Sequence, residues 1–482
     1  MNQTVTIIGG GLAGCEAAYQ IAKKGYKVKL YEMKPTKFSN AHSNKNLAEI
    51  VCSNSFKSNL HTNACGLLKE ELRILDSLLI QCADKTSVPA GQALAVDRDK
   101  FSELVTKEIK QNPNIEIINR EYMGNELISR GTVCGNTSLD MTPLCPKTLE
   151  AKLNTNSYNT NITIIATGPL TSDAFAKNIQ KITGEEDLYF YDAAAPIVTK
   201  ESIDMNIAFY GDRYEQERGK EEDIDSWKKR ISNIEASYIN LPMNKEEYEE
   251  FVKELVNAEI VTLHEFEKRE IFEGCMPIEI MAKRGGDTLR FGPLKPVGFT
   301  DLRTGFRPYA IVQLRQDDVN GTIYNLVGFQ TNLKFGEQKR VFSNIPGLKN
   351  AEFVKYGVMH RNTYINGGKL LDNTYCLKKN PNIYFAGQIT GVEGYVESIS
   401  SGMVVGLNVV NRLQGKERIQ FPKTTMIGAL ANYISTENEK FQPMNANFGI
   451  LPELAEKIRD KKLKYTYLAD RAIEEIKKLC KL

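Results

Sequence analysis

VTIIGGGLAG, residues 5–14, is the stretch of this 482-residue chain that decides its fold. The β-branched run before the glycines predicts a short buried strand, and the residues after them predict a helix as far as Lys24. In the pattern Gly-x-Gly-x-x-Gly the first glycine makes a tight turn, the second lets backbone approach a pyrophosphate, and the third permits close packing of helix on strand. The residues expected to hold the phosphates are Gly9, Gly10, Gly11, Leu12, Ala13 and Gly14.

A second strand, expected over Lys27–Tyr31, completes a β-α-β unit and is closed by Glu32. An acid about 20 residues after the glycines can accept hydrogen bonds from the ribose hydroxyls of a dinucleotide. Strand, glycines, helix and acid in this order therefore predict a dinucleotide site. The competing interpretation is a glycine-rich turn followed by a coincidental glutamate.

Two later segments favour FAD over NAD as the dinucleotide. A buried-strand pattern over 162–168 ends in Thr167 and Gly168, which we expect beside the dinucleotide. The segment ending in Gly387 and Gln388 resembles the late strand of two-dinucleotide-fold flavoproteins, in which the last polar residue is usually Asp and lies near the flavin ribityl and phosphates. The expected fold is therefore α/β, with a Rossmann-like FAD domain and a smaller insertion domain. An ordinary strand–helix turn is the alternative for 387–388.

The composition limits which classes of protein are compatible with the sequence. Hydrophobic residues make up 41% of the chain and charged residues 25%, as in globular proteins, and the length predicts more than one domain. Lys and Arg total 62 against 60 Asp and Glu, so a net charge of +2 excludes binding of nucleic acid by overall basicity, but not by a local basic face. No signal peptide or apolar run of about 20 residues is seen, which predicts a cytoplasmic protein without a membrane partner. Nine cysteines without a Cys-x-x-Cys pair predict thiols and no metal site.

A series of motifs resembles one known family. GGGLAGCEAA, AEIVCSNSFKS, TNACGLLKEEL, VPAGQALAVDRDKF, ATGPLTS, FYDAAAPIV, FEGCMPIEIMAKRG, FGPLKPVG, YAIVQLRQDD, VGFQTNLKFGEQKRVF, YGVMHRNTYIN and FAGQITGVEGYVES occur in this order. Together they resemble the folate- and FAD-dependent uracil-5-methyltransferases, bacterial enzymes that make 5-methyluridine in the T loop of tRNA. The resemblance covers about 5–110 and 162–412. Related flavoproteins that modify the tRNA wobble position share the glycine motif but extend well beyond 482 residues, so the length argues against that group.

The resemblance implies a use for two cysteines. Uracil C5 becomes nucleophilic only after a thiolate has added at C6, and a second group must then remove the C5 proton. In that family the carbon comes from methylenetetrahydrofolate, the reduced flavin carries or reduces it, and NAD(P)H recharges the flavin. The family's two cysteines correspond here to Cys52 and Cys275, of which we favour Cys275 for uracil C6 and Cys52 for a place beside the flavin. We interpret five others as buried thiols: Cys15, Cys65, Cys82, Cys376 and Cys480.

The resemblance also places His360 in the folate pocket, where an imidazole could stack on the pterin; a structural histidine is the alternative. His42, His61 and His264 are interpreted as surface or loop histidines.

RNA contact is expected from a smaller domain inserted in the FAD domain. We predict an FAD-binding domain over 1–195 and 346–482 and an insertion domain over 196–345, which would carry the substrate RNA and Cys275. Cations and aromatic residues alternate there, which suits phosphate contact and base stacking, although charge runs are more often solvated faces. The members of this group are Lys283, Arg284, Arg290, Phe291, Lys295, Phe299, Arg303, Phe306, Arg307, Lys334, Phe335, Lys339 and Arg340.

The RNA itself is left open by the sequence. Residues 119–161 and the charged run 212–232 depart from the family pattern, and a relative of the family performs the same chemistry on 23S ribosomal RNA. The substrate is therefore tRNA, or alternatively 23S rRNA. A function of another class, an FAD-dependent oxidoreductase acting on a small molecule, would need neither folate nor RNA.

Overall fold

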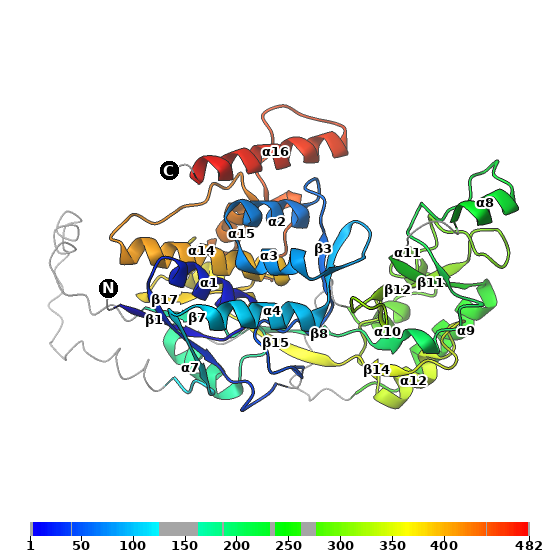
Figure 1. Ribbon diagram of the computed structural model, residues 1–482, viewed down its shortest axis with the longest axis horizontal. Helices are drawn as coiled ribbons and strands as arrows, with labels where there is room; N and C mark the ends of the chain where they lie inside the picture. The colour runs from blue at the N-terminus through cyan, green and yellow to red at the C-terminus, as the bar shows by residue number, and fades with distance from the viewer. Residues whose placement is uncertain are drawn as a thin grey trace.

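The computed structural model describes residues 3–39, 41–124, 162–185, 188–231, 237–261, 276–439 and 441–480, with the backbone alone for 188–192, 360 and 361 (Figure 1). The chain forms two units that lie next to each other along the longest axis of the molecule. The first unit takes both ends of the chain, and the second is inserted between β8 and β15.

The first unit is built on a six-stranded sheet with the order β16-β17-β7-β1-β2-β6, in which only β16 runs antiparallel. Its strands are β1 (Thr4–Ile8), β2 (Lys27–Glu32), β6 (Ile115–Asn119), β7 (Thr163–Ile165), β16 (Cys376–Leu377) and β17 (Asn380–Phe385). Counted along the chain, the parallel strands have the order 3-2-1-4-5 of a Rossmann-like sheet, as predicted. Such sheets bind ligands where the carboxyl ends of neighbouring strands diverge, here beside β1 and β7.

Two helices pack closely at this point, α1 (Leu12–Lys23) and α14 (Tyr395–Leu413). A side chain at Gly402 would overlap the backbone of Ala13, so glycine allows the two helices to touch. The other helices of this unit are α2 (Ala64–Ile74), α3 (Leu78–Lys85), α4 (Arg98–Gln111), α7 (Asp173–Thr183), α13 (Gly367–Leu370), α15 (Met426–Ser435) and α16 (Lys461–Leu479). In Figure 1, α1, α2 and α14 lie above the sheet and α7 lies below it.

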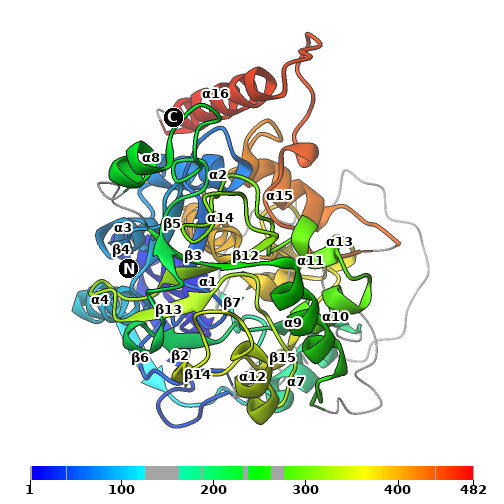
Figure 2. The ribbon, with the colours of Figure 1, turned by 90° about the vertical axis from the view of Figure 1, so that its right-hand side faces the viewer.

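The second unit is an antiparallel sheet of order β10-β11-β12-β13-β9-β14 with its own hydrophobic core. Its strands are β9 (Ile197–Thr199), β10 (Phe209–Tyr210), β11 (Tyr238–Met243), β12 (Ala310–Gln316), β13 (Ile323–Leu326) and β14 (Phe353–Lys355). Its helices are α8 (Ile224–Ile231), α9 (Lys245–Asn257), α10 (Ile278–Lys283), α11 (Thr288–Phe291) and α12 (Phe335–Phe342). Figure 2 faces this unit and shows α9, α10 and α12 together, with α8 at the far end. Its last strand, β14, follows residue 345, and the division at 196 and 345 stays a prediction.

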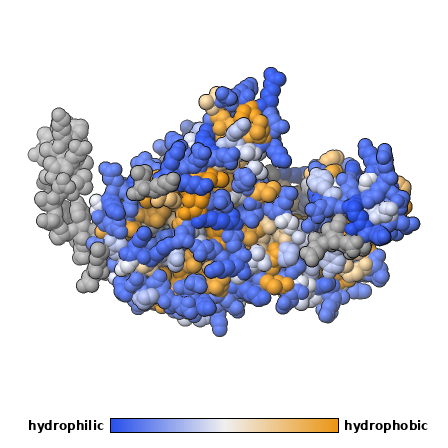
Figure 3. Space-filling view, turned by 45° about the horizontal axis from the view of Figure 1, so that its top comes forward, coloured by the Kyte–Doolittle hydropathy of each residue, from blue (hydrophilic) through white to orange (hydrophobic). Residues whose placement is uncertain are grey.

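Two short sheets lie outside the two large ones. β8 (Leu188–Ala193) leads into the second unit and pairs with β15 (Met359–Tyr364), which leads out of it. β3 (Ser55–Ser58), β4 (Ser87–Val88) and β5 (Ala93–Val96) form a three-stranded sheet beside them. Polar residues cover most of the face in Figure 3, on both units. None of the helices in the described ranges combines the length and apolarity that crossing a membrane requires.

Three details of the expected elements differ. Residues 67–85 form two helices, because Asp76 adopts a left-handed backbone (φ 61°) and Ser77 caps the second helix. In the described part of the C-terminal tail, which ends at residue 480, the α-helix covers only Lys461–Leu479. In the charged run 212–232 only Ile224–Ile231 is helical, and its Trp227 is fully buried, donating from Nε1 to the carbonyl of Gln216 at 2.9 Å.

Candidate cofactor and thiol site

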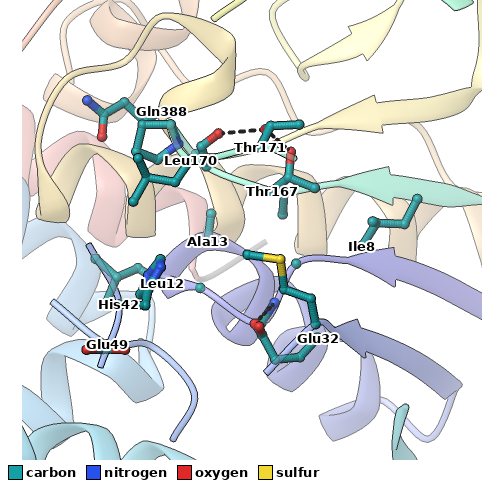
Figure 4. A pocket seen from close by; sticks show the side chains of 18 of the residues that line it. Ile8, Leu12, Ala13, Glu32, His42, Glu49, Thr167, Leu170, Thr171 and Gln388 are labelled. Carbon is teal, nitrogen blue, oxygen red and sulfur yellow. Dashed lines mark hydrogen bonds between the residues drawn. The ribbon is translucent and has the colours of Figure 1, made fainter. Parts of the chain in front are cut away.

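One pocket lies at the carboxyl ends of the parallel strands and receives residues from segments far apart in sequence. In Figure 4, Ile8, Leu12, Ala13 and Glu32 lie on one side of it, and Thr167, Leu170, Thr171 and Gln388 lie across from them. Its lining includes these predicted residues: Gly9, Gly10, Gly11, Leu12, Ala13, Glu32, Cys52, Thr167, Gly168, Gly387 and Gln388.

The three motif glycines have different surroundings. Gly9 has a φ of 108°, and a side chain there would overlap the carbonyl of Ala166 on the neighbouring strand. A side chain at Gly14 would overlap the carbonyl of Gly9, so this glycine holds helix against strand. A Cβ at Gly11 would meet no protein atom within 4 Å. Gly11 therefore keeps open a space in the pocket at the N-terminus of α1, where backbone N–H groups favour phosphate.

Glu32 forms the adjoining wall and is only 8% exposed. Its Oε2 accepts from the Gly10 N–H at 3.0 Å and its Oε1 from the Lys34 N–H at 2.9 Å. These two bonds fix the carboxylate, and each oxygen keeps a further lone pair that can accept from a ribose hydroxyl. The carboxylate is thus fixed to the glycine turn and can still accept hydrogen bonds on the pocket side.

The opposite wall follows β7 and β17. Thr167 and Thr171 share a hydrogen bond of 2.6 Å between their hydroxyls, and Thr171 Oγ1 also donates to the Gly168 carbonyl at 3.0 Å. Gly387 has a φ of 82° and donates its N–H to Ser401 Oγ at 2.7 Å. These bonds hold both strand ends in an open turn, so the next residue, Gln388, can face the pocket.

An aromatic group that the sequence did not indicate closes one end of the pocket. Tyr122 makes edge-to-face contacts with Tyr31 (4.9 Å between ring centroids) and Phe175 (5.7 Å), and the Arg120 guanidinium lies 5.3 Å from the Tyr31 ring. All four line the pocket and can accommodate a planar base. Arg120 and Tyr122 follow β6, a parallel strand of the same sheet, so the sheet order would have indicated them.

A charged pair and a histidine complete the rim. Lys34 and Glu49 are 3% and 8% exposed and pair at 3.0 Å. Burial opposes the charge of Glu49, but the N–H of Ser43 and the Lys34 ammonium hold its pKa below the ordinary value. His42, interpreted from sequence as a surface or loop histidine, lies in a loop and lines the pocket, with its Nδ1 2.7 Å from Ser39 Oγ.

Cys52 is half-buried and lies in the same pocket as the glycine turn. Its N–H and that of Ser53 both donate to the hydroxyl oxygen of Tyr395, at 3.0 and 3.1 Å. Burial raises the pKa of Tyr395, so its hydroxyl stays protonated and keeps a proton to donate into the pocket. Tyr395, the first residue of α14, was not singled out from the sequence.

Residues at the end of β12 in the second unit contact the segment that carries Cys52. Arg315 on β12 is 8% exposed and donates from Nε to Asn54 Oδ1 at 2.9 Å and from Nη2 to Ser53 Oγ at 2.6 Å. Arg98 donates to the carbonyl of Val51 at 3.2 Å and pairs with Asp317 at 3.0 Å. Burial opposes its charge, yet the Asp317 carboxylate keeps the pKa of Arg98 above its usual range. The residue before Cys52 is thus held by Arg98 of α4, which pairs with Asp317, and the two residues after it are held by Arg315 of β12.

Two predicted site residues are not placed. Cys275 lies outside the described residues, which resume at Met276. The backbone of His360 lies in β15 opposite Asp192, and its side chain is outside the description. Both roles stay predictions.

The other described cysteines are poor candidates for a thiolate. Four of them, Cys15, Cys65, Cys82 and Cys376, are buried as predicted. Burial raises the pKa of Cys65 and Cys376 to about 11 and that of Cys82 to about 12. Cys480 is exposed, contrary to prediction, because it ends α16 at the surface. No group of three potential metal ligands occurs among the residues that the structure describes.

The basic group of the second unit is less open than its sequence indicated. Most of its cations pair with nearby carboxylates, which lowers their value for phosphate contact: Arg290 with Asp287, Arg303 with Asp301, Arg307 with Glu217, Lys334 with Glu259, and Arg340 with Glu254 and Glu337. Phe299 is buried and cannot stack on a base, whereas Phe291, Phe306 and Phe335 are 81%, 69% and 55% exposed.

Fold and site together define a dinucleotide-binding α/β protein of the two-dinucleotide-fold flavoprotein type, with Cys52 in the same pocket as the glycine turn. A family model described as glucose inhibited division protein A matches residues 4–417, so the chain belongs to that family.

Its curated relatives match over their full length. Methylenetetrahydrofolate--tRNA-(uracil-5-)-methyltransferase TrmFO of Acetivibrio thermocellus is 57% identical over 478 residues, 99% of this chain and 98% of the relative. The protein of the same name from Fusobacterium nucleatum is 55% identical over 477 residues, 99% of each chain. Among solved structures, Aquifex aeolicus GidA has a TM-score of 0.64 at 16% identity, over 99% of this chain and 73% of that one. The last likeness concerns the fold alone.

Proposed function

We propose that this protein transfers the methylene of 5,10-methylenetetrahydrofolate to C5 of a uridine in RNA, in the T loop of tRNA, and reduces it to methyl with reduced FAD, giving 5-methyluridine. The observation that carries the proposal is the single pocket in which Cys52 and the dinucleotide turn meet. The relatives that match end to end bear the name of this activity.

The pocket fits FAD. The space at Gly11 suits a pyrophosphate, Glu32 can accept from the adenosine ribose, and the aromatic end around Tyr122 suits the adenine. Gln388 and the start of α14 would hold the other half of the cofactor. When bound, the flavin would supply the electrons that reduce the methylene to methyl, and NAD(P)H would replenish them.

The protein's own groups then have three tasks. A thiolate, for which we propose Cys275, adds to C6 of the uracil, and C5 becomes the nucleophile that attacks the methylene carbon. Cys52 is proposed either to take the C5 proton or to handle the incoming methylene. Removal of that proton restores the C5–C6 double bond and expels the thiolate from C6. His360 is proposed to stack on the pterin.

Cys52 is held ready for such a role. The Tyr395 hydroxyl accepts from the backbone N–H groups of Cys52 and Ser53, and Arg315 holds the Ser53 side chain, while Cys52 lines the pocket. The Arg98 guanidinium contacts the preceding carbonyl and brings positive charge close to the thiol, which favours a thiolate. We propose that the second unit, predicted over 196–345, presents the RNA to this pocket. The need for reduced thiols fits action in the cytoplasm.

One incubation tests the proposal. Purified protein is mixed with FAD, NADH and methylenetetrahydrofolate labelled in its methylene, and with unmodified tRNA or 23S rRNA in separate tubes. We expect a yellow protein and label in 5-methyluridine of tRNA. Label in 23S rRNA alone would assign the alternative substrate, and NADH consumption that needs neither folate nor RNA would favour a small-molecule oxidoreductase. Cys275→Ala with undiminished methylation would refute the thiolate step.

A further inference from the structure

Three aromatic rings form a continuous pile on the second unit, next to the point where the chain returns to the first. Phe335 opens α12, and its ring lies 5.1 Å from that of Tyr356, with an angle of 16° between the planes. Tyr356 stacks in turn on Phe353 of β14, at 5.4 Å and 10°. We call these three residues the Phe335 stack. Its inner end contacts Phe342, a buried residue of the core, and its outer end is exposed.

The backbone beneath the Phe335 stack is held rigidly. Gln338 is fully buried on α12, and its side-chain amide makes two hydrogen bonds of 2.8 Å with the N–H and C=O of Gly357. The helix that carries Phe335 is therefore locked to the segment that carries Tyr356. A ring held in this way loses little conformational freedom when a partner stacks on it.

The Phe335 stack lies close to the Cys52 pocket. Lys355 immediately precedes Tyr356. Burial together with the charge of Arg98 lowers the pKa of this lysine, and the charges of Glu49 and Cys52 oppose that shift. Further along the chain, β15 carries Asn362 into the pocket lining. Six residues of extended chain span about 20 Å, which limits the distance between Tyr356 and Asn362. Figure 1 shows α12, β14 and β15 in succession along the lower edge of the molecule.

Phe335 is 55% exposed although it stacks on Tyr356, so part of its surface is free to meet a ligand. Single exposed aromatic rings are common on protein surfaces, but three nearly parallel rings that end in solvent offer an aromatic platform on which a base can stack. Lys339, one helical turn further along α12, is exposed and has no carboxylate partner in the described part of the chain. An exposed ammonium one helical turn from an aromatic ring suits a nucleotide, since it can contact the phosphate while the base stacks.

We propose that the Phe335 stack is a platform on which an unpaired nucleobase of the substrate RNA continues the pile, which positions the loop while the target uridine enters the Cys52 pocket. This inference rests on the proposed function and names an RNA contact for it. A pterin is another planar ring in the proposed reaction, but Phe335 does not line the pocket. Its exposed position suits a base attached to a chain that runs over the surface.

The test measures RNA binding apart from chemistry. Dissociation constants for an unmodified tRNA transcript are measured without folate for the wild-type protein and for Phe335→Ala, Phe335→Leu and Phe335→Trp. We expect the alanine and leucine variants to bind about 5- to 150-fold more weakly, the range for loss of one base–aromatic stack, and the tryptophan variant to bind like the wild type. Tyr467→Ala removes a ring of similar exposure (49%) from α16, remote from this region, and should leave binding unchanged.

A spectroscopic signal separates stacking from general damage. A transcript with 2-aminopurine at single unpaired loop positions should lose fluorescence on binding at one position, and Phe335→Leu should restore it. Unchanged RNA affinity in Phe335→Ala, or a raised KM for methylenetetrahydrofolate with RNA binding intact, would overturn the proposal. Wild-type protein that binds the transcript with this signal but transfers no methyl group would overturn the proposed function and leave the platform supported.

Discussion

Replacement of Arg315 should loosen the Cys52 segment without touching the pocket. Arg315→Met keeps most of the apolar stem but removes the donors to Asn54 Oδ1 (2.9 Å) and Ser53 Oγ (2.6 Å). Hydrogen bonds from a charged group are worth about 1.5–3 kcal/mol each, so the gross loss is roughly 3–6 kcal/mol. Burial disfavours the charged guanidinium and lowers the pKa of Arg315. The variant no longer has to bury this charge, which offsets part of the loss. We expect a net fall of about 2–4 kcal/mol in the free energy of unfolding.

The assay follows stability and the thiol together. Urea unfolding gives the free energy, and alkylation by iodoacetamide with peptide mapping gives the reactivity of Cys52, which should rise as the segment loosens while the kcat for methylation falls. Lys245→Met is the control, because Lys245 pairs with Glu249 at 3.7 Å on the exposed surface of α9 in the same unit and should change stability by less than about 1 kcal/mol. If Arg315→Met unfolds and alkylates like the wild type, β12 does not hold Cys52 and our account of the interface is wrong.

Three further outcomes are expected. Gly14→Ala should lower the Tm and fail to retain FAD, because its Cβ would overlap the carbonyl of Gly9. Gly11→Ala should keep the wild-type Tm and lose only flavin affinity, because its Cβ would meet no protein atom. Flavin content and thermal unfolding of the two variants check both expectations. Burial lowers the pKa of Lys69 from 10.5 to about 8, so between these pH values the unfolded chain binds a proton that the folded protein has lost. The free energy of unfolding should therefore rise by at most about 3 kcal/mol between pH 8 and pH 10.5. Urea titrations should show this rise in the wild-type protein and not in Lys69→Met. The emission of Trp227, the single and fully buried tryptophan, should shift to the red when the second unit unfolds, and an unshifted spectrum would contradict its placement in that unit.

The predictions from sequence were most accurate where interactions between neighbouring residues determine the structure. The β-α-β unit was predicted from residues 5–32, because its strand, turn and helix are set by neighbouring residues, and side chains at Gly9 and Gly14 would overlap backbone within or beside this unit. The long helical pattern over 67–85 failed at Asp76, since apolar spacing continues through a left-handed residue that breaks the helix. The motifs also indicated Cys52, but not what holds it.

The sequence alone determined the Rossmann-like half, its glycine turn and the acid that ends its second strand, because these depend on local conformation and on the absence of side chains at particular glycines. Only the tertiary structure decided the surroundings of Cys52. Tyr395 lies 343 residues from Cys52 and Arg315 lies 262 residues from Ser53 along the chain, and no local pattern fixes which buried donor meets which acceptor at such separation. The same holds for the Phe335 stack, whose three rings become parallel only when α12 packs against β14.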